Sequence, residues 1–193
     1  MKRITTTLLA LGLSVGAAHA TETFSQDSLA TALPTVDVQT LGNLSDCLNA
    51  DMSDVSSRAI RACTKAYRAS VPDYDIRSDL LTRRGLLRLS SGKVESATRD
   101  FDKAARLVDD NEFANLGLGF AALLENDAAT AKARFADCAD HQRAAPLAAY
   151  GLALTLEMSG DRAGAIAAYE RALTLQPGWS MAQENLANLR AAI

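Results

Sequence analysis

The sequence predicts an all-α fold in which antiparallel helix hairpins stack side by side as a solenoid, closed by a C-terminal capping helix. Residues of matching size recur every 34 positions, and turn-forming residues recur at the same interval. In addition, 48% of the 193 residues are hydrophobic, and alanine and leucine are frequent among them. That composition favours closely packed helices over sheets.

Five sets of positions keep the 34-residue interval. Aromatic residues form one set, and small residues precede each aromatic by four and by sixteen positions. A single set could arise by coincidence, but five parallel sets indicate an internal repeat. The sets are Phe101, Phe135 and Tyr169; Ala97, Ala131 and Ala165; Gly85, Gly119 and Ala153; Gly92, Asn126 and Gly160; and Ala104, Cys138 and Ala172.

The pattern predicts two antiparallel helices per repeat. A small residue on each helix, such as Gly85 and Ala97, allows the two backbones to approach closely, and the aromatic side chain fills the space beside them. A single hairpin leaves one apolar face uncovered, so successive hairpins must stack.

This pattern resembles the tetratricopeptide repeat family, whose 34-residue unit has the same small–small–aromatic–small order. The segment GDRAGAIAAYERALTLQP is similar to the family consensus. The resemblance implies a right-handed α-α superhelix with repeats over residues 78–111, 112–145 and 146–179. Arg84 and Asn115 stand where the family prefers apolar residues, so looser packing is expected at those edges.

Two segments are expected to precede the helices. Residues 1–20 predict a secretory signal peptide, because Lys2 and Arg3 precede an apolar stretch that ends in an A-x-A cleavage site at Ala20. Residues 21–45 are rich in Thr, Ser and Asp and predict a flexible leader. We therefore expect a periplasmic or secreted bacterial protein without membrane insertion.

Net charge argues against polyanionic partners. Loss of Lys2 and Arg3 removes two of the 20 basic residues and none of the 23 acidic ones, which moves the formal net charge from −3 to −5. A mildly acidic chain without a basic run does not predict binding to nucleic acid or to an anionic membrane.

A divergent helical hairpin is expected over residues 46–77, and a capping helix over residues 180–193. Cys47 and Cys63 have the same separation as Gly85 and Phe101, so they are expected to face each other and form a disulfide. Such a closure contributes about 3 kcal/mol of stability. The alternative is a catalytic or metal-binding pair, although the spacing differs from C-x-x-C and no histidine is nearby.

Other candidate chemistry has simpler explanations. Cys138 replaces a buried alanine and is expected to be a shielded thiol, whereas an exposed one would link two chains. His141 lies in a loop without a metal-binding partner, and Ser90 and Lys93 have an S-x-x-K spacing on a predicted turn. The sequence therefore predicts no catalytic residues, metal site or cofactor.

The resemblance implies a concave groove lined by the first helices of the repeats. Two other interpretations remain open: these residues could be core between neighbouring helices, or the leader could cover them. The predicted lining is Leu86, Phe113, Leu116, Phe120, Leu123, Leu147, Tyr150, Leu154 and Met158, with Thr82, Leu124 and Glu157 beside it.

The leading hypothesis is a non-catalytic protein–protein interaction module of the cell envelope, acting as a scaffold or as an assembly or chaperone factor. Its expected ligand is a protein or peptide, specifically a helix or apolar segment that enters an apolar groove. The alternative is a self-associating structural protein of the periplasm, for which a homo-oligomer is expected.

Overall fold

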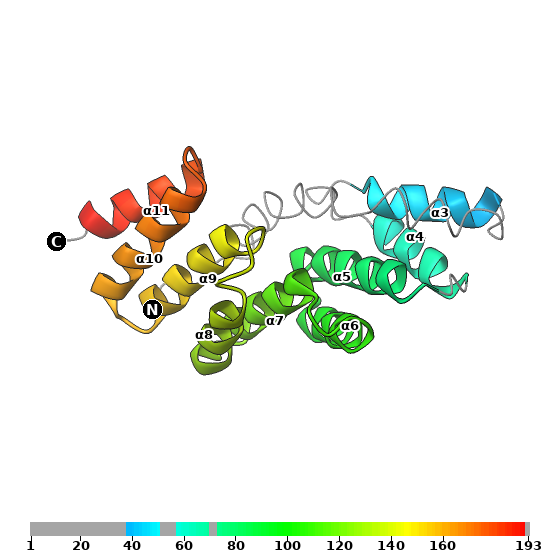
Figure 1. Cartoon of the computed structure of the whole chain (residues 1–193), viewed down its shortest axis with the longest axis horizontal. Helices are drawn as coiled ribbons and strands as arrows, with labels where there is room; N and C mark the ends of the chain where they lie inside the picture. Colours follow the sequence, from blue (N-terminus) through cyan, green and yellow to red (C-terminus); the bar gives the residue numbers. More distant parts are fainter. Residues whose placement is uncertain (1–37, 51–56, 70–72, 192–193) are drawn as a thin grey trace.

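The protein is described by a computed structural model that covers residues 38–50, 57–69 and 73–191. Within these ranges the chain forms nine helices that follow one another as antiparallel hairpins (Figure 1). The predicted all-α fold is confirmed. The helices are α3 (Val38–Leu48), α4 (Ser57–Arg68), α5 (Tyr74–Ser90), α6 (Val94–Leu107), α7 (Glu112–Leu124), α8 (Ala128–Asp137), α9 (Ala145–Met158), α10 (Arg162–Leu175) and α11 (Ser180–Ala191).

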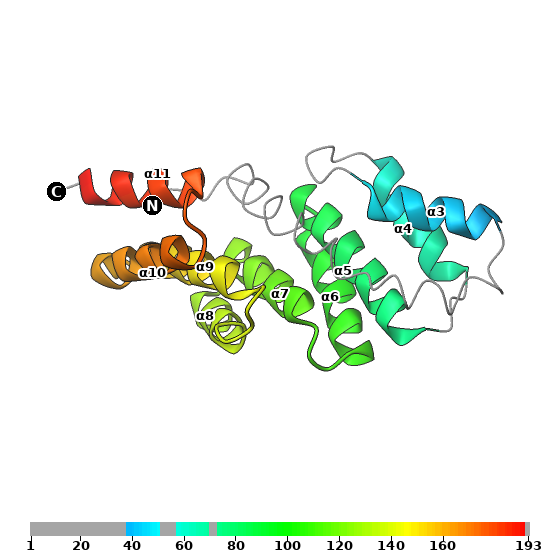
Figure 2. The same cartoon turned by 45° about the horizontal axis from the view of Figure 1, so that its top comes forward.

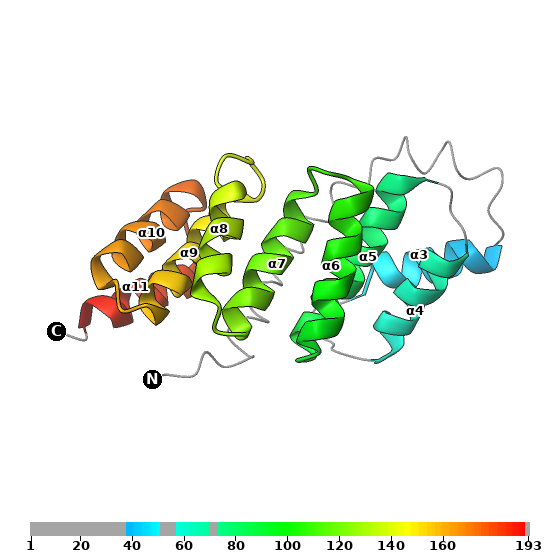
Figure 3. The ribbon, with the colours of Figure 1, turned by 90° about the horizontal axis from the view of Figure 1, so that it is seen from below.

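The hairpins form two layers. The first layer consists of α3, α5, α7 and α9, which contact one another in turn. The second layer consists of α4, α6, α8 and α10, and each first-layer helix packs against the second-layer helices next to it in the sequence. Figure 2 shows the hairpins following one another along the long axis, with α3 and α4 at one end and α10 and α11 at the other. Seen from below, α6 and α8 lie on the near side of the stack (Figure 3). Packing is therefore mainly between neighbours in the sequence, as in other solenoids.

The turn inside each repeated hairpin has one hydrogen-bonded form. Gly92, Asn126 and Gly160 have φ angles of 73°, 61° and 81°, in the left-handed region. After the first of them, the Lys93 amide donates to the Arg88 carbonyl at 2.8 Å, and the equivalent bonds in the next two turns are 2.9 Å long. This helix-ending motif favours glycine or asparagine. The turn positions lie where the 34-residue interval predicted them.

Each aromatic ring of the repeat is held between two first-layer helices. Phe101 is fully buried, and a Cβ atom at either Gly85 of α5 or Gly117 of α7 would lie 2.5 Å from its ring. The two helices can therefore close on the ring only because both positions lack a side chain. Phe135 has the same relation to Gly119 and Gly151.

The third aromatic position is closed differently, because the capping helix takes part. Asn185 of α11, 34 positions after Gly151, donates to the hydroxyl groups of Tyr150 at 3.0 Å and Tyr169 at 3.4 Å. Trp179, which precedes α11, lies with its ring centroid 4.7 Å from that of Tyr150. The cap thus covers the apolar end of the last hairpin.

The N-terminal hairpin repeats the same packing with a disulfide in place of a ring. Cys47 of α3 is bonded to Cys63 of α4, with Cα atoms 4.7 Å apart. Cys63 takes the place that Phe101 has in α6. The buried positions are Ala59, Ala62, Cys63 and Ala66 in α4 and Ala97, Asp100, Phe101 and Ala104 in α6.

This hairpin begins earlier than predicted. Helix α3 starts at Val38, within the segment 21–45 that was expected to be flexible, because Leu44 and Cys47 bury one side of it against its neighbours. The predicted signal peptide (1–20) and the first part of the leader (21–37) lie outside the described residues.

Replacing Gly117 by alanine should destabilise the protein, because the new methyl group would overlap the Phe101 ring. We expect a loss of about 1–3 kcal/mol in the free energy of unfolding, measured by urea titration. The control is Gly42→Ala in α3, where a Cβ atom meets nothing within 4 Å. Alanine there should stabilise the helix slightly. Equal stability of both variants would contradict the close approach at Phe101.

Candidate functional site

The predicted groove residues lie on the first-layer helices, and all except Met158 are buried. The rings of Phe120 and Tyr150 face the second layer instead of an open surface. Phe120 packs edge to face on Phe135 of α8 at a centroid distance of 4.9 Å, and Tyr150 packs on Tyr169 of α10 at 5.7 Å. Such pairs stabilise the contact between helices of one hairpin.

Buried positions are held by Leu86, Phe113, Leu116, Phe120, Leu123, Leu147, Tyr150 and Leu154. The ring contacts of Phe120 and Tyr150 are made to the second layer, which agrees with the interpretation of core packing. The groove itself stays a prediction. The leader interpretation concerns residues 21–45, of which 21–37 lie outside the described ranges and 38–45 begin α3, so it stays a prediction. The accessible part of the predicted lining is its rim, where Leu124 and Met158 are half-buried and Glu157 is exposed.

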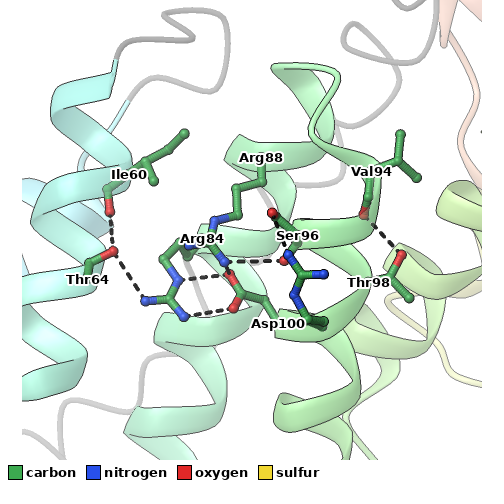
Figure 4. A network of polar contacts seen from close by, with 9 residues as sticks. Ile60, Thr64, Arg84, Arg88, Val94, Ser96, Thr98 and Asp100 are labelled. Carbon is green, nitrogen blue, oxygen red and sulfur yellow. Dashed lines mark hydrogen bonds and ion pairs between the residues drawn. The ribbon is translucent and has the colours of Figure 1, made fainter.

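A buried polar network joins three helices near the N-terminal end of the stack (Figure 4). Arg84 of α5 donates to both carboxylate oxygens of Asp100 on α6, at 2.8 and 2.7 Å, and Arg88 donates to the same carboxylate at 2.6 Å. The third branch of Arg84 donates to Thr64 of α4 at 3.2 Å. The Asp100 side chain is only 3% exposed, so these charges are paired away from water.

The expectation of loose packing at Arg84 is wrong. Its guanidinium finds a carboxylate sixteen residues later, and it also lies 5.4 Å from the ring of Tyr67. Asn115, the other departure from the repeat pattern, accepts a hydrogen bond from Arg134 at 3.3 Å. Each polar side chain therefore replaces an apolar contact with a specific pairing.

A second arginine fixes the end of α3. Arg83 donates through Nε to the Cys47 carbonyl at 2.7 Å and through Nη2 to the Ala50 carbonyl at 2.8 Å. The Cys47 carbonyl lies in the last turn of α3, where it also accepts from the Ala50 amide at 3.4 Å, and the Ala50 carbonyl lies just beyond the helix. Together with the disulfide, Arg83 attaches the N-terminal hairpin to α5 as a defined unit.

Replacing Asp100 by alanine should strongly destabilise the protein, because Arg84 would remain buried without a counter-charge. The expected loss is about 3–5 kcal/mol in the free energy of unfolding, measured by chemical denaturation. Glu170→Ala is the matched control, since its ion pair with Arg190 is half-exposed and should contribute little. An Asp100 variant as stable as the control would show that the network is not essential.

The loop before α9 places a histidine and an arginine against the start of α7. His141 was expected to lie in a loop without a metal-binding partner; its Nε2 is 3.4 Å from Asp110 and its Nδ1 is 3.8 Å from Glu112. Arg143 pairs with Glu112 at 2.9 Å and lies 4.9 Å from the ring of Phe113. No group of three or more His, Cys, Asp or Glu side chains that could hold a metal ion occurs among the described residues.

Asp79 of α5 is the acid of this region whose pKa is shifted most from its ordinary value. Its pKa is raised to about 6, chiefly by burial and also by the nearby carboxylates of Asp75 and Asp73, while Arg143 acts in the opposite direction. The folded protein therefore binds a proton at Asp79 that the unfolded chain releases near pH 4. Consequently, this group stabilises the fold at low pH, and that contribution is lost as the pH rises to about 6.

Asp79→Asn should make the protein more stable above pH 6 and should flatten the pH dependence between about pH 4 and 6. The expected gain at pH 8 is about 1–3 kcal/mol, because a buried charge is replaced by a neutral amide. Urea unfolding at several pH values measures it. Asp140→Asn, at an exposed loop position, is the control. A gain no larger than that of the control would contradict the burial of the Asp79 charge.

The remaining candidate residues have structural roles. Cys138 is a free, buried thiol whose Sγ–H donates to the Glu112 carbonyl at 3.6 Å, and burial raises its pKa to about 12. It is thus the shielded thiol that the repeat pattern predicted. Ser90 donates to the Leu86 carbonyl in its own helix, and Lys93 is exposed at the following turn. Ser90 is engaged with the backbone, as expected for a turn.

The sequence interpretation missed a basic face on α4. Arg58, Arg61, Lys65 and Arg68 are all exposed, and the helix contains no acidic residue. These residues are three or four positions apart, so they lie on one side of the helix, although they form no contiguous run. Helical spacing of single basic residues was the signal that could have revealed this surface.

A family model of the tetratricopeptide repeat matches residues 146–179, which are the bounds expected for the third repeat. The structure of MamA from Desulfovibrio magneticus RS-1 superposes with a TM-score of 0.64, over 81% of this chain and 86% of that chain. The chain has a tetratricopeptide-repeat fold. The sequence identity in this comparison is 17%, so the similarity is one of fold.

Other solved structures superpose with slightly lower TM-scores. A crystal structure of the MamA protein has a TM-score of 0.60 and 20% identity, covering 79% of this chain and 81% of that chain. MamA of AMB-1 has a TM-score of 0.58 and 17% identity, covering 80% and 89%. No curated protein matches the sequence.

Proposed function

We propose that this tetratricopeptide-repeat chain is a non-catalytic module that binds other polypeptides. The observation that carries the proposal is the unbroken stack of hairpins from α3 to α11, which presents a continuous surface along its whole length. Each hairpin is fixed by its neighbours, so the surface is ordered before a partner arrives. A polypeptide can contact several successive hairpins at once, which a small molecule cannot.

The partner surface proposed here is the rim of the first layer. Leu124 at the end of α7 and Met158 at the end of α9 are half-buried, and Glu157 beside them is exposed. An apolar segment or amphipathic helix can pack on the two apolar side chains while Glu157 meets a polar or basic group. The buried residues of the predicted groove support this rim from below without touching the partner.

We also propose that the protein acts in the bacterial cell envelope, in the periplasm. The basic and apolar residues before Ala20 support export, and a disulfide between Cys47 and Cys63 suits an oxidising compartment. None of the described helices is long and apolar enough to cross a membrane.

End-to-end self-association is the weaker alternative. The exposed positions of α11 are mainly polar, including Gln183, Glu184, Asn188 and Arg190. A cap with a polar outer side ends a solenoid and offers little apolar surface to a second copy.

Photocrosslinking in intact cells tests the proposal. A benzoylphenylalanine at Met158 should give discrete adducts with a second polypeptide, whereas the same group at the exposed Thr130 of α8 should not. The difference is expected because Met158 lies on the proposed rim and Thr130 on the second layer.

Two outcomes would contradict this proposal. Adducts at Thr130 but not at Met158 would move the contact to the second layer, and adducts with the mass of two identical chains would favour self-association. Osmotic shock of the same cells should release the protein with the periplasmic fraction. Retention with the cytoplasm would exclude the proposed location.

A further inference from the structure

We propose that the basic face of α4, formed by Arg58, Arg61, Lys65 and Arg68, binds an acidic segment of a partner polypeptide. This surface lies on the second layer at the N-terminal end of the stack, away from the rim at Met158 (Figure 1). It is therefore a separate contact, and it does not depend on the rim.

Helix stability does not explain the basic residues. Lys65 and Arg68 lie in the last turn, where cations are favourable, but Arg58 lies in the first turn and no acidic residue accompanies it. A positive charge at a helix N-terminus is unfavourable, and like charges three or four positions apart repel one another. The arrangement at Arg58 and Arg61 thus costs stability, as expected for residues that serve binding.

The basic face is held in one position. The opposite side of α4 is buried through Ala59, Ala62, Cys63 and Ala66, and Cys63 is bonded to α3. Thr64 of α4 accepts a hydrogen bond from the buried Arg84. The helix that carries the four cations is already ordered, so their attraction to an acidic ligand is not offset by ordering the helix.

Three of the four exposed cations lack partners within the described part of the chain. Arg58, Arg61 and Lys65 have no side-chain hydrogen bond or ion pair there, in contrast to the buried Arg83 and Arg84. From Arg58 to Arg68 the helix rises about 15 Å. An extended segment of about five residues spans that length, so a short run of Asp and Glu residues matches the face in size and charge.

An acidic polypeptide fits this surface better than a membrane or a nucleic acid. The apolar side of α4 is packed inside the protein, so the helix cannot insert it into a bilayer interface. A long polyanion would also meet the rest of the chain, which is more acidic than the whole because it has all 23 acidic residues while four of the 20 basic ones lie on α4. A short acidic segment meets the basic face alone.

Binding of a fluorescent decaglutamate peptide tests the proposal, with a decaglutamine peptide as the neutral comparison. The full mature chain should bind decaglutamate only, and binding should weaken as sodium chloride is raised. The triple variant Arg58→Glu, Arg61→Glu and Lys65→Glu should weaken binding about tenfold or more, since it replaces attraction by repulsion. Its melting temperature should change little, because the negative charge gained near the helix N-terminus offsets the cation lost from the last turn at Lys65.

The matched control reverses three exposed basic residues on other helices and turns, Lys93, Lys132 and Arg171, and changes the net charge equally. It should bind decaglutamate within about threefold of the unmodified chain. Equal losses in both variants, or no binding of decaglutamate by the unmodified chain, would overturn the proposal. Tighter binding to vesicles of phosphatidylglycerol than to the peptide, lost in the α4 variant, would also overturn it in favour of a lipid surface.

Discussion

The structure depends on an aromatic ring wedged between two first-layer helices that have no side chain at the point of contact. Phe101 lies between Gly85 and Gly117, and this contact sets the distance between α5 and α7. Phe135 makes the same contact between Gly119 of α7 and Gly151 of α9, so the spacing is repeated along the stack. Where the wedge is missing, at the N-terminal hairpin, a covalent bond through Cys63 occupies the corresponding place.

The fold could be predicted because its constraint recurs in the sequence, whereas the site could not. Glycine, alanine and aromatic residues at fixed intervals specify hairpins directly. The same periodicity shows that Phe120 and Tyr150 are apolar and lie on first-layer helices, but not whether they point toward a ligand or toward the second layer. That direction depends on rings contributed by other helices, Phe135 and Tyr169, which approach only when the hairpin is folded.

Charged residues illustrate the same limit. Arg84 and Arg61 are the same residue type in neighbouring helices, yet one is buried in a three-helix network and the other is exposed on α4. The difference arises because Asp100 is brought opposite Arg84 by the hairpin turn, which no local pattern around Arg84 indicates. Buried arginines hold the N-terminal hairpin in place, and as a result the exposed ones are displayed on a rigid helix.

The single tryptophan of the chain makes its fluorescence a probe of one end of the stack. Trp179 is buried against Tyr150 beneath the capping helix, far from the disulfide-bonded hairpin at the other end. In a solenoid held mainly by contacts between neighbours, the two ends can open at different denaturant concentrations. Indole emission therefore reports on fraying of the C-terminal cap, while far-ultraviolet circular dichroism follows the helices of the whole stack.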